Sequence, residues 1–358
     1  MFLKKGFSMS EIDLVFNLPG GISRLPLHVG AIKAYRDAGL PKPKRIIASS
    51  AGAMAGSAII GWNDEALDKA IDIIGNLSPN DIFSFQRGLK VKLATLGIAT
   101  VGLGVLILLD HKLSKSKKAA FGLSGLSALL IADALVGHEL VHSASHLSPS
   151  PLKNLLSREL DFSSIFNSSI QLDVLVADME KPGEVIFSNR HPLNSDLKNS
   201  AHRERWVNIL LASSRLPGKF PFVKIDGIDT IDGEVWTDFP VRQMKEHQKA
   251  IRFDYWAPLQ SEKAPQEWIS DLSRSFDIMR DRCTQKKIEN YQYERLANPS
   301  LPEIFYFRLN QDLLKQMPQV KIHNFTPADM KTLENIGYQA VQEQLPELRK
   351  YLETKTPR

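Results

Sequence analysis

Two kinds of apolar pattern alternate along the first sixty residues of the chain. Residues 12–18, IDLVFNL, form a short apolar run that is typical of a buried strand. Residues 25–37 instead place apolar side chains at helical spacing, and the run 45–49 followed by the stretch 51–62 repeats this order. Strand, helix, strand, helix predicts an α/β protein with a largely parallel sheet, whose ligand sites lie at the carboxyl ends of the strands.

The same fold class continues beyond residue 149. The last helix has a clear start, with Thr326 as the cap, Pro327 at the first helical position and Asp329 in the first turn. The pattern predicts further strands at 170–179, 251–256 and 303–309, and further helices at 205–214 and 269–295. We therefore expect one large domain over residues 10–358.

An apolar insertion interrupts this pattern at residues 88–148. Residues 93–109 carry no charge, residues 119–136 carry only Asp133, and a basic turn at 112–118 separates them. As a helix the first run extends roughly 25 Å, just short of a bilayer core of about 30 Å. We expect a helical hairpin at 93–136 that contacts a membrane surface. The alternatives are a hairpin that spans the membrane, a hairpin buried in the fold and a lid over an apolar site.

Composition and charge add little to this picture. The chain has 358 residues with 24% charged, a formal net charge of +5 and a pI of about 9.1, a mild basic excess that favours anionic surfaces such as membranes or nucleic acid. The single cysteine, Cys283, excludes an internal disulfide and fits a reducing compartment. No secretory signal is visible after Met1 or after the alternative start Met9, so we expect a cytoplasmic protein.

A stretch of small residues, KRIIASSAGAMAG at 44–56, carries the first candidate chemistry. One interpretation is structural, because a serine at a helix start caps backbone N–H groups and small residues allow close packing. The other is a nucleophile elbow, in which a strand turns abruptly into a helix and presents a serine. In the register Ala48-Ser49-Ser50-Ala51-Gly52 the nucleophile is Ser50, with Ala48 at the first glycine position of G-x-S-x-G.

Two further glycine turns accompany the elbow. Gly20-Gly21 follows the first predicted strand and precedes a helix, with Arg24 three residues later, so its amides form an anion-binding cradle. It lacks the spacing of a phosphate-binding loop. Downstream, Asp232-Gly233 stands in a predicted turn, with Asp226-Gly227 as a rival pair. An Asp-Gly pair alone is a common turn.

Together, these blocks resemble the patatin-like phospholipase family, whose members carry a Gly-Gly-Gly-x-Arg-Gly turn, a G-x-S-x-G elbow and an Asp-Gly-Gly or Asp-Gly-Ala turn in that order. LPGGISRLPLHVGAIKAY, ASSAGAMAG and SRLPGKFPFVKIDG…DGEVWTDFPV match the three blocks, and the similarity covers about 12–62 and 165–350. It does not cover the apolar hairpin. The chain departs from the family pattern at four positions: Ile22, Leu25, Ala48 and Glu234.

The resemblance implies a three-layer α/β/α fold with Ser50 as nucleophile and Asp232 as base, in a Ser–Asp dyad without histidine. It further implies that the amides of Gly20, Gly21 and Ile22 hold the oxyanion and that Arg24 supports their loop. His28 is then a packing residue, and Asp226, Asp229 and Asp238 are expected away from Ser50. The implied substrate is a phospholipid or lysophospholipid at a membrane surface, with no cofactor and no nucleic acid partner.

Two other functions stay open at this point. His138-Glu139-Leu140-Val141-His142 reads H-E-x-x-H, a zinc metalloprotease signature in which His138 and His142 would be the ligands, with Glu159 as a candidate third ligand. Its structural interpretation is a polar helix end at a membrane interface. The departures from the family pattern also allow a catalytically degenerate scaffold that only binds membranes.

Overall fold

The structure is a computed structural model, and it describes residues 12–85, 147–181, 183–192, 199–216, 220–236, 239–246, 248–255, 268–318, 320 and 324–354. The chain divides into two compact units. The sheet unit comprises Met1–Asp81, Lys153–Arg215 and Phe222–Arg358, and the small unit comprises Ile82–Leu152 and Leu216–Pro221. In its described part, the small unit contains β3 (Ser84–Phe85) paired antiparallel with β4 (Leu147–Ser148).

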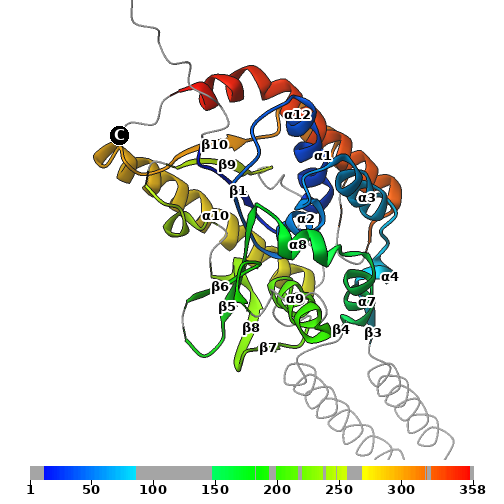
Figure 1. Ribbon diagram of the computed structural model, residues 1–358. Helices are drawn as coiled ribbons and strands as arrows, with labels where there is room; N and C mark the ends of the chain where they lie inside the picture. The colour runs from blue at the N-terminus through cyan, green and yellow to red at the C-terminus, as the bar shows by residue number, and fades with distance from the viewer. Residues whose placement is uncertain are drawn as a thin grey trace, which may run out of the picture. The chain divides into compact units, whose positions relative to one another are not determined.

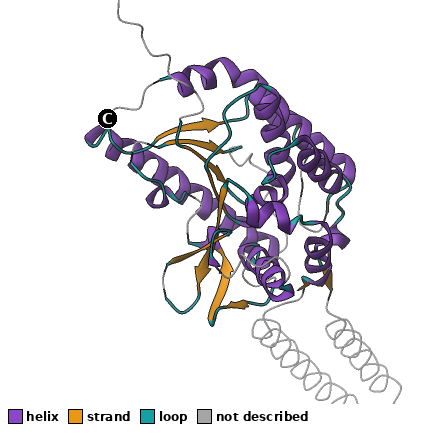
Figure 2. Cartoon of the chain, in the orientation of Figure 1, coloured by secondary structure: helices purple, strands orange, loops and turns teal. Residues whose placement is uncertain are grey.

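One mixed sheet forms the centre of the sheet unit (Figures 1 and 2). Its strand order is β10-β9-β1-β2-β5-β8-β7, with β6 also paired to β5. The pairs from β10 to β5 are parallel, whereas β6, β7 and β8 join by antiparallel pairs. The strands are β1 (Leu14–Leu18), β2 (Arg45–Ala48), β5 (Gln171–Asp178), β6 (Glu184–Ser188), β7 (Val223–Ile225), β8 (Ile228–Asp232), β9 (Lys249–Phe253) and β10 (Glu303–Phe307).

Helices cover this sheet, as the three-layer prediction requires. Figure 1 shows α1 (Arg24–Asp37), α3 (Asp64–Gly75) and α12 (Pro327–Glu353) together on one side and α10 (Trp268–Ala297) on the other. Gly30 and Gly337 bring α1 and α12 into backbone contact, because a Cβ at Gly337 would lie 2.2 Å from the Leu27 carbonyl oxygen. The other helical segments are α2 (Ser50–Ile59), α4 (Pro79–Ile82), α7 (Ser150–Glu159), α8 (Phe162–Asn167), α9 (Ser200–Ser213), η3 (Gly233–Val235), η4 (Val241–Gln243) and α11 (Gln311–Gln316).

The core explains why the apolar runs form strands. All five residues of β1 are buried, and Phe16 contacts Tyr35 and Phe253 edge-on with ring centroids 5.1 Å apart in each pair. Strands covered on both faces need such continuous apolar runs. The predicted start of the last helix is confirmed, since Thr326 and Asp329 form a capping box with Pro327 at its first position.

The predicted boundaries differ from the structure at several elements. β9 covers 249–253 rather than 251–256, because Lys249 and Ala250 pair with the start of β10. α9 starts at Ser200 rather than 205, with Asn199 capping the amide of Ala201. Asp232 ends a strand rather than standing in a turn, and the β7–β8 hairpin was not predicted. Its strands are short, and β8 carries polar residues, so neither shows a clear alternation.

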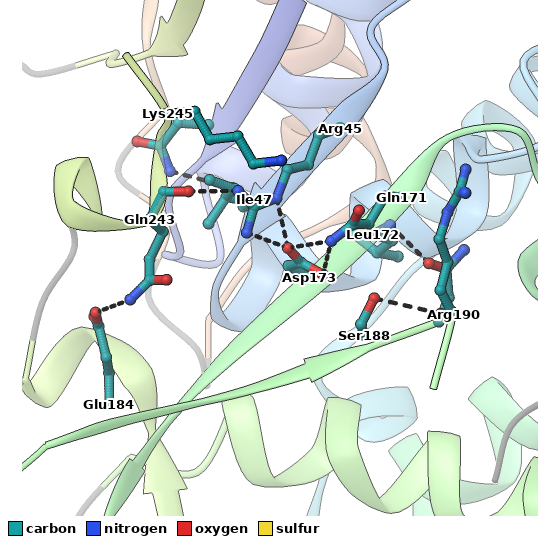
Figure 3. Close-up of polar contacts among 12 residues, drawn as sticks. Arg45, Ile47, Gln171, Leu172, Asp173, Glu184, Ser188, Arg190, Gln243 and Lys245 are labelled. Atoms are coloured by element: carbon teal, nitrogen blue, oxygen red, sulfur yellow. Dashed lines mark hydrogen bonds and ion pairs between the residues drawn. The ribbon is translucent and has the colours of Figure 1, made fainter. Parts of the chain in front are cut away.

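A partly buried polar cluster lies where β2 begins, at the opposite end of this strand from Ser50 (Figure 3). Arg45 donates from Nε to the buried carboxylate of Asp173 at 2.6 Å, and Gln171 donates from Nε2 to both oxygens of that carboxylate. Arg45 also donates to the Gln243 carbonyl oxygen, and the Gln243 side chain donates to Glu184. The cluster therefore ties η4 to β2, β5 and β6.

Several sequence predictions lie outside the described residues. They are the apolar hairpin at 93–136, which makes up most of the insertion 88–148, and the H-E-x-x-H stretch with His138 and His142. Of the helices in the described ranges, none has the length and hydropathy needed to cross a bilayer. Within the same ranges, no three His, Cys, Asp or Glu side chains are grouped so as to hold a metal ion.

Candidate active site

Ser50 stands at an abrupt strand-to-helix turn. β2 ends at Ala48 and α2 begins at Ser50, whose φ of 49° lies in the left-handed region that non-glycine residues rarely adopt. Ser49 takes the N-cap position, but its side chain makes no capping hydrogen bond. A Cβ at Gly52 would lie 2.0 Å from the Leu18 carbonyl oxygen, so this position accepts no side chain. The local geometry is that of a nucleophile elbow rather than a capped helix start.

A buried serine holds the strained backbone of the elbow. The amide of Ser50 donates to Ser213 Oγ at 2.8 Å, and Ser213 Oγ donates to the Leu175 carbonyl oxygen at 2.7 Å. Ser213 is the last residue of α9 and is fully buried. Sequence reasoning missed it, although a serine ending the apolar run ILLAS is an available signal. It connects the elbow to the middle of β5.

The glycine turn after β1 packs directly against Ser50. A Cβ at Gly20 would lie 2.3 Å from Ser50 Cβ and 3.0 Å from Ser50 Oγ, so only glycine fits. Gly21 has a φ of 111°, while Ile22 is not among the residues with positive φ. The isoleucine at the third glycine position of the family pattern therefore causes no backbone strain. Arg24 donates from Nη1 to the Gly20 carbonyl oxygen at 2.9 Å, which braces the turn.

His28 supports the same turn from the core. The ring is fully buried and donates from Nε2 to the Pro19 carbonyl oxygen at 2.7 Å. Burial lowers the pKa of His28 to about 3, a shift that the hydrogen bond to Pro19 opposes and the nearby charge of Arg24 assists. The imidazole is therefore neutral at physiological pH and holds the loop through one N–H group.

Asp232 reaches the same region from the antiparallel half of the sheet. It ends β8, pairs in register with Val176 and is buried, and its carboxylate accepts the amide of Glu234 at 3.0 Å. The next residue, Gly233, packs against the Leu175 carbonyl oxygen, which lies 2.6 Å from the position of a Cβ there. This is the carbonyl that Ser213 contacts. Ser50, through Ser213, and Asp232, through its neighbour Gly233, are thus both connected to the Leu175 carbonyl group of β5.

The rival Asp-Gly pair has a different place. Asp226 and Gly227 have φ values of 51° and 87° and form the two-residue turn between β7 and β8. Positive φ at both central residues is the pattern of a type I′ hairpin turn. Asp226 forms an ion pair with Arg205. The hydrogen bond from Arg205 is the main reason that the pKa of the Asp226 carboxyl group is lowered. Asp229 pairs with Lys224 at 3.7 Å, and Asp238 lies outside the described residues.

Glu234 brings a second carboxylate into the site, which sequence reasoning recorded only as a departure from the family pattern. Its Oε1 accepts the amide of Gly20 and lies 3.9 Å from Arg24 Nη1, and its side chain is 7% exposed. Its Cδ and Ser50 Oγ both lie 3.0 Å from the position that a Gly20 Cβ would take. Glu234 therefore reaches the point where the glycine turn meets the serine.

The site can perform acyl transfer of the serine type. It combines a half-buried turn serine, a buried carboxylate at the end of β8 and a glycine turn with backbone donors at the entrance to α1. Within the described part of the chain, no oxygen accepts a hydrogen bond from the amides of Gly21 and Ile22. These two amides are available to a developing oxyanion, while that of Gly20 already has Glu234 as its acceptor.

A comparison with protein families decides what this site belongs to. The family model described as patatin-like phospholipase matches residues 18–245, which contain the glycine turn, the elbow and the Asp232 turn. The chain belongs to the patatin-like phospholipase family. Members of this family are generally lipid hydrolases, so the family supports the hydrolysis of a lipid ester. No curated protein sequence matches the chain.

Two solved structures are similar to the chain at low sequence identity. VipD from Legionella pneumophila is 13% identical with a TM-score of 0.44, and the match covers 94% of this chain and 67% of VipD. The type III effector protein ExoU is 15% identical with a TM-score of 0.33, and the match covers 98% of this chain and 56% of ExoU. The chain thus spans little more than half of ExoU.

Proposed function

We propose that this patatin-like protein is a lipid acyl hydrolase that cleaves a phospholipid or lysophospholipid ester through an acyl-enzyme on Ser50. The observation that carries the proposal is the contact between the elbow and the glycine turn. Ser50 has the left-handed backbone of an elbow. Gly20 lies so close to the Ser50 side chain that a Cβ on Gly20 would not fit. A nucleophile and backbone donors in contact form the arrangement that acyl transfer needs.

In the proposed reaction Ser50 Oγ attacks the ester carbonyl carbon and passes its proton to the Asp232 carboxylate. The carbonyl oxygen becomes an oxyanion held by the amides of the glycine turn, to which the resemblance assigns Gly20, Gly21 and Ile22. Collapse of the intermediate releases the alcohol, which takes the proton from Asp232 and leaves the acyl group on Ser50. Water, deprotonated by the same carboxylate, then attacks the acyl carbon; the bond to Ser50 Oγ breaks, Asp232 returns the proton to Ser50 Oγ, and the fatty acid is released.

Burial is what allows a carboxylate to act as this base. Asp232 is 1% exposed, and its carboxylate receives a hydrogen bond from the amide of Glu234. Desolvation makes a carboxylate a stronger base, whereas a donated hydrogen bond makes it weaker. Asp232 holds its position through the ladder with β5 and through its own amide, which donates to the Arg215 carbonyl oxygen at 3.2 Å. No histidine is needed to relay the proton.

Two exposed apolar side chains near the site favour hydrolysis at a lipid surface. Val235 and Trp236, which directly follow Glu234, are 55% and 48% exposed. Tryptophan is enriched where proteins meet the membrane interface. The membrane contact predicted for residues 93–136, with a basic turn suited to anionic head groups, remains a second part of this proposal.

The dyad is tested by replacing two aspartates in otherwise identical chains. Asp232→Asn should retain the fold by circular dichroism and lose hydrolysis of both a phospholipid and a short soluble ester. Asp226→Asn is the matched control, because it changes the other Asp-Gly pair, which forms the β7–β8 turn. Full activity in Asp232→Asn would refute the proposed base. Activity that survives in Ser50→Ala and disappears with a chelator would instead indicate the H-E-x-x-H zinc chemistry.

A further inference from the structure

The contact between Glu234 and Gly20 is not explained by the proposed reaction. Glu234 stands where the family pattern has glycine or alanine, so most of its side chain has no counterpart there. Its carboxylate accepts the Gly20 amide, and the Glu234 side chain is only 7% exposed. A buried carboxylate on an amide of the glycine turn resembles the anion that the turn is built to receive.

We propose that Glu234 is an internal occupant of the oxyanion site, which the substrate carbonyl oxygen must displace before Ser50 can react. This inference rests on the proposed function and adds its regulation. Two effects of the carboxylate oppose the reaction. It uses the Gly20 amide, and its negative charge lies beside the position where the oxyanion would develop.

The neighbouring groups show how the carboxylate is held in place. Arg24 braces Gly20 through its carbonyl oxygen and lies 3.9 Å from Glu234 Oε1, so one guanidinium group stabilises both the turn and its occupant. The Glu234 amide donates to Asp232, which fixes the start of η3 beside the proposed base. The occupant is therefore anchored at its backbone and at its carboxylate, both within the candidate active site.

The competing role for a carboxylate at this position is to shape the glycine turn for catalysis. The two roles predict opposite changes in the reaction rate when Glu234 is removed. If Glu234 shapes the turn, its removal lowers the rate. If Glu234 occupies the oxyanion site, its removal raises the rate by roughly 10- to 100-fold, the range that one charge-assisted hydrogen bond represents.

The experiment compares the full chain with Glu234→Ala, which restores the family's Asp-Gly-Ala sequence, and with Glu234→Gln, which keeps the shape and removes the charge. Glu180→Ala, at an exposed position after β5, is the control. The readouts are the rate constant for labelling by a fluorophosphonate probe and kcat/KM for a short soluble ester. Thermal unfolding checks that each variant is folded.

We expect Glu234→Ala to react at least about tenfold faster in both assays, Glu234→Gln to be intermediate, and Glu180→Ala to match the unchanged protein. Equal rates, or slower rates in folded Glu234 variants, would overturn the inference while leaving Ser50 as the nucleophile. If neither the unchanged protein nor Glu234→Ala is labelled at Ser50, the proposed function fails and this inference fails with it.

Discussion

Replacing Ser213 by alanine tests how the elbow is held. Ser213 Oγ accepts the Ser50 amide at 2.8 Å and donates to the Leu175 carbonyl oxygen at 2.7 Å, and it has no exposed surface. Ser213→Ala leaves both partners without this hydroxyl group. A buried group that loses its hydrogen bond costs about 1–3 kcal/mol. Because the two losses share one side chain, we expect the free energy of unfolding to fall by about 2–3 kcal/mol.

The same change should slow the reaction. Without its acceptor, the Ser50 amide no longer holds φ in the left-handed region, so the hydroxyl group loses its fixed position. Misplacement of a reacting group by about 1 Å can cost about 100-fold in rate, and we expect a loss of tenfold or more in kcat with little change in KM.

Ser214→Ala is the control for this prediction. Ser214 is the next residue; it is half-buried, and its hydroxyl group donates to the Leu211 carbonyl oxygen at 3.0 Å. Its removal should cost less than about 1 kcal/mol and leave kcat unchanged. Urea unfolding and ester hydrolysis measure both quantities. If Ser213→Ala and Ser214→Ala behave alike in both assays, Ser213 does not hold the elbow.

Three further predictions follow from the same region. Gly20→Ala should reduce kcat/KM about 100-fold, since its Cβ would lie 2.3 Å from Ser50 Cβ, whereas Gly75→Ala, with open space around it, should not; equal activities would contradict the contact. Unfolded His28 takes up a proton below pH 6.5 that the folded protein binds only near pH 3, so stability is complete above pH 6.5 and falls on acidification. Between these pH values the free energy of unfolding of the unchanged protein should fall by about 1.4 kcal/mol per pH unit more than that of His28→Gln. If the two proteins lose stability with pH at the same rate, His28 is not a buried neutral imidazole. Trp236→Ser should lower the ratio of vesicle to soluble-ester hydrolysis, and an unchanged ratio would exclude Trp236 from lipid contact.

The parts of the fold that sequence predicted share one physical property. β1 and β5 are buried strands made mostly of apolar residues, and the last helix begins with side chains that cap its own amides. Such signals are local, so they survive without knowledge of the partner strands. Ser50 belongs with them, because its elbow needs only a short strand followed by small residues.

The parts that sequence did not predict depend on distant partners. β7 and β8 are short and mixed in polarity, and they become strands by pairing with each other and with β5. Ser213 appears as an ordinary helix residue until α9 brings it to Ser50, 163 positions away. Glu234 similarly meets Gly20 across 214 positions. The role of such residues follows from the contact and not from their local sequence.

Identification of the serine that reacts tests the central claim most directly. The full chain is treated with a fluorophosphonate probe, and the modified peptide is identified by mass spectrometry, with Ser50→Ala and Ser49→Ala measured in parallel. The proposed mechanism predicts that the probe modifies Ser50, that modification and ester hydrolysis both disappear in Ser50→Ala, and that Ser49→Ala is still modified at Ser50. Modification of a different residue, or hydrolysis that persists in Ser50→Ala, would contradict it.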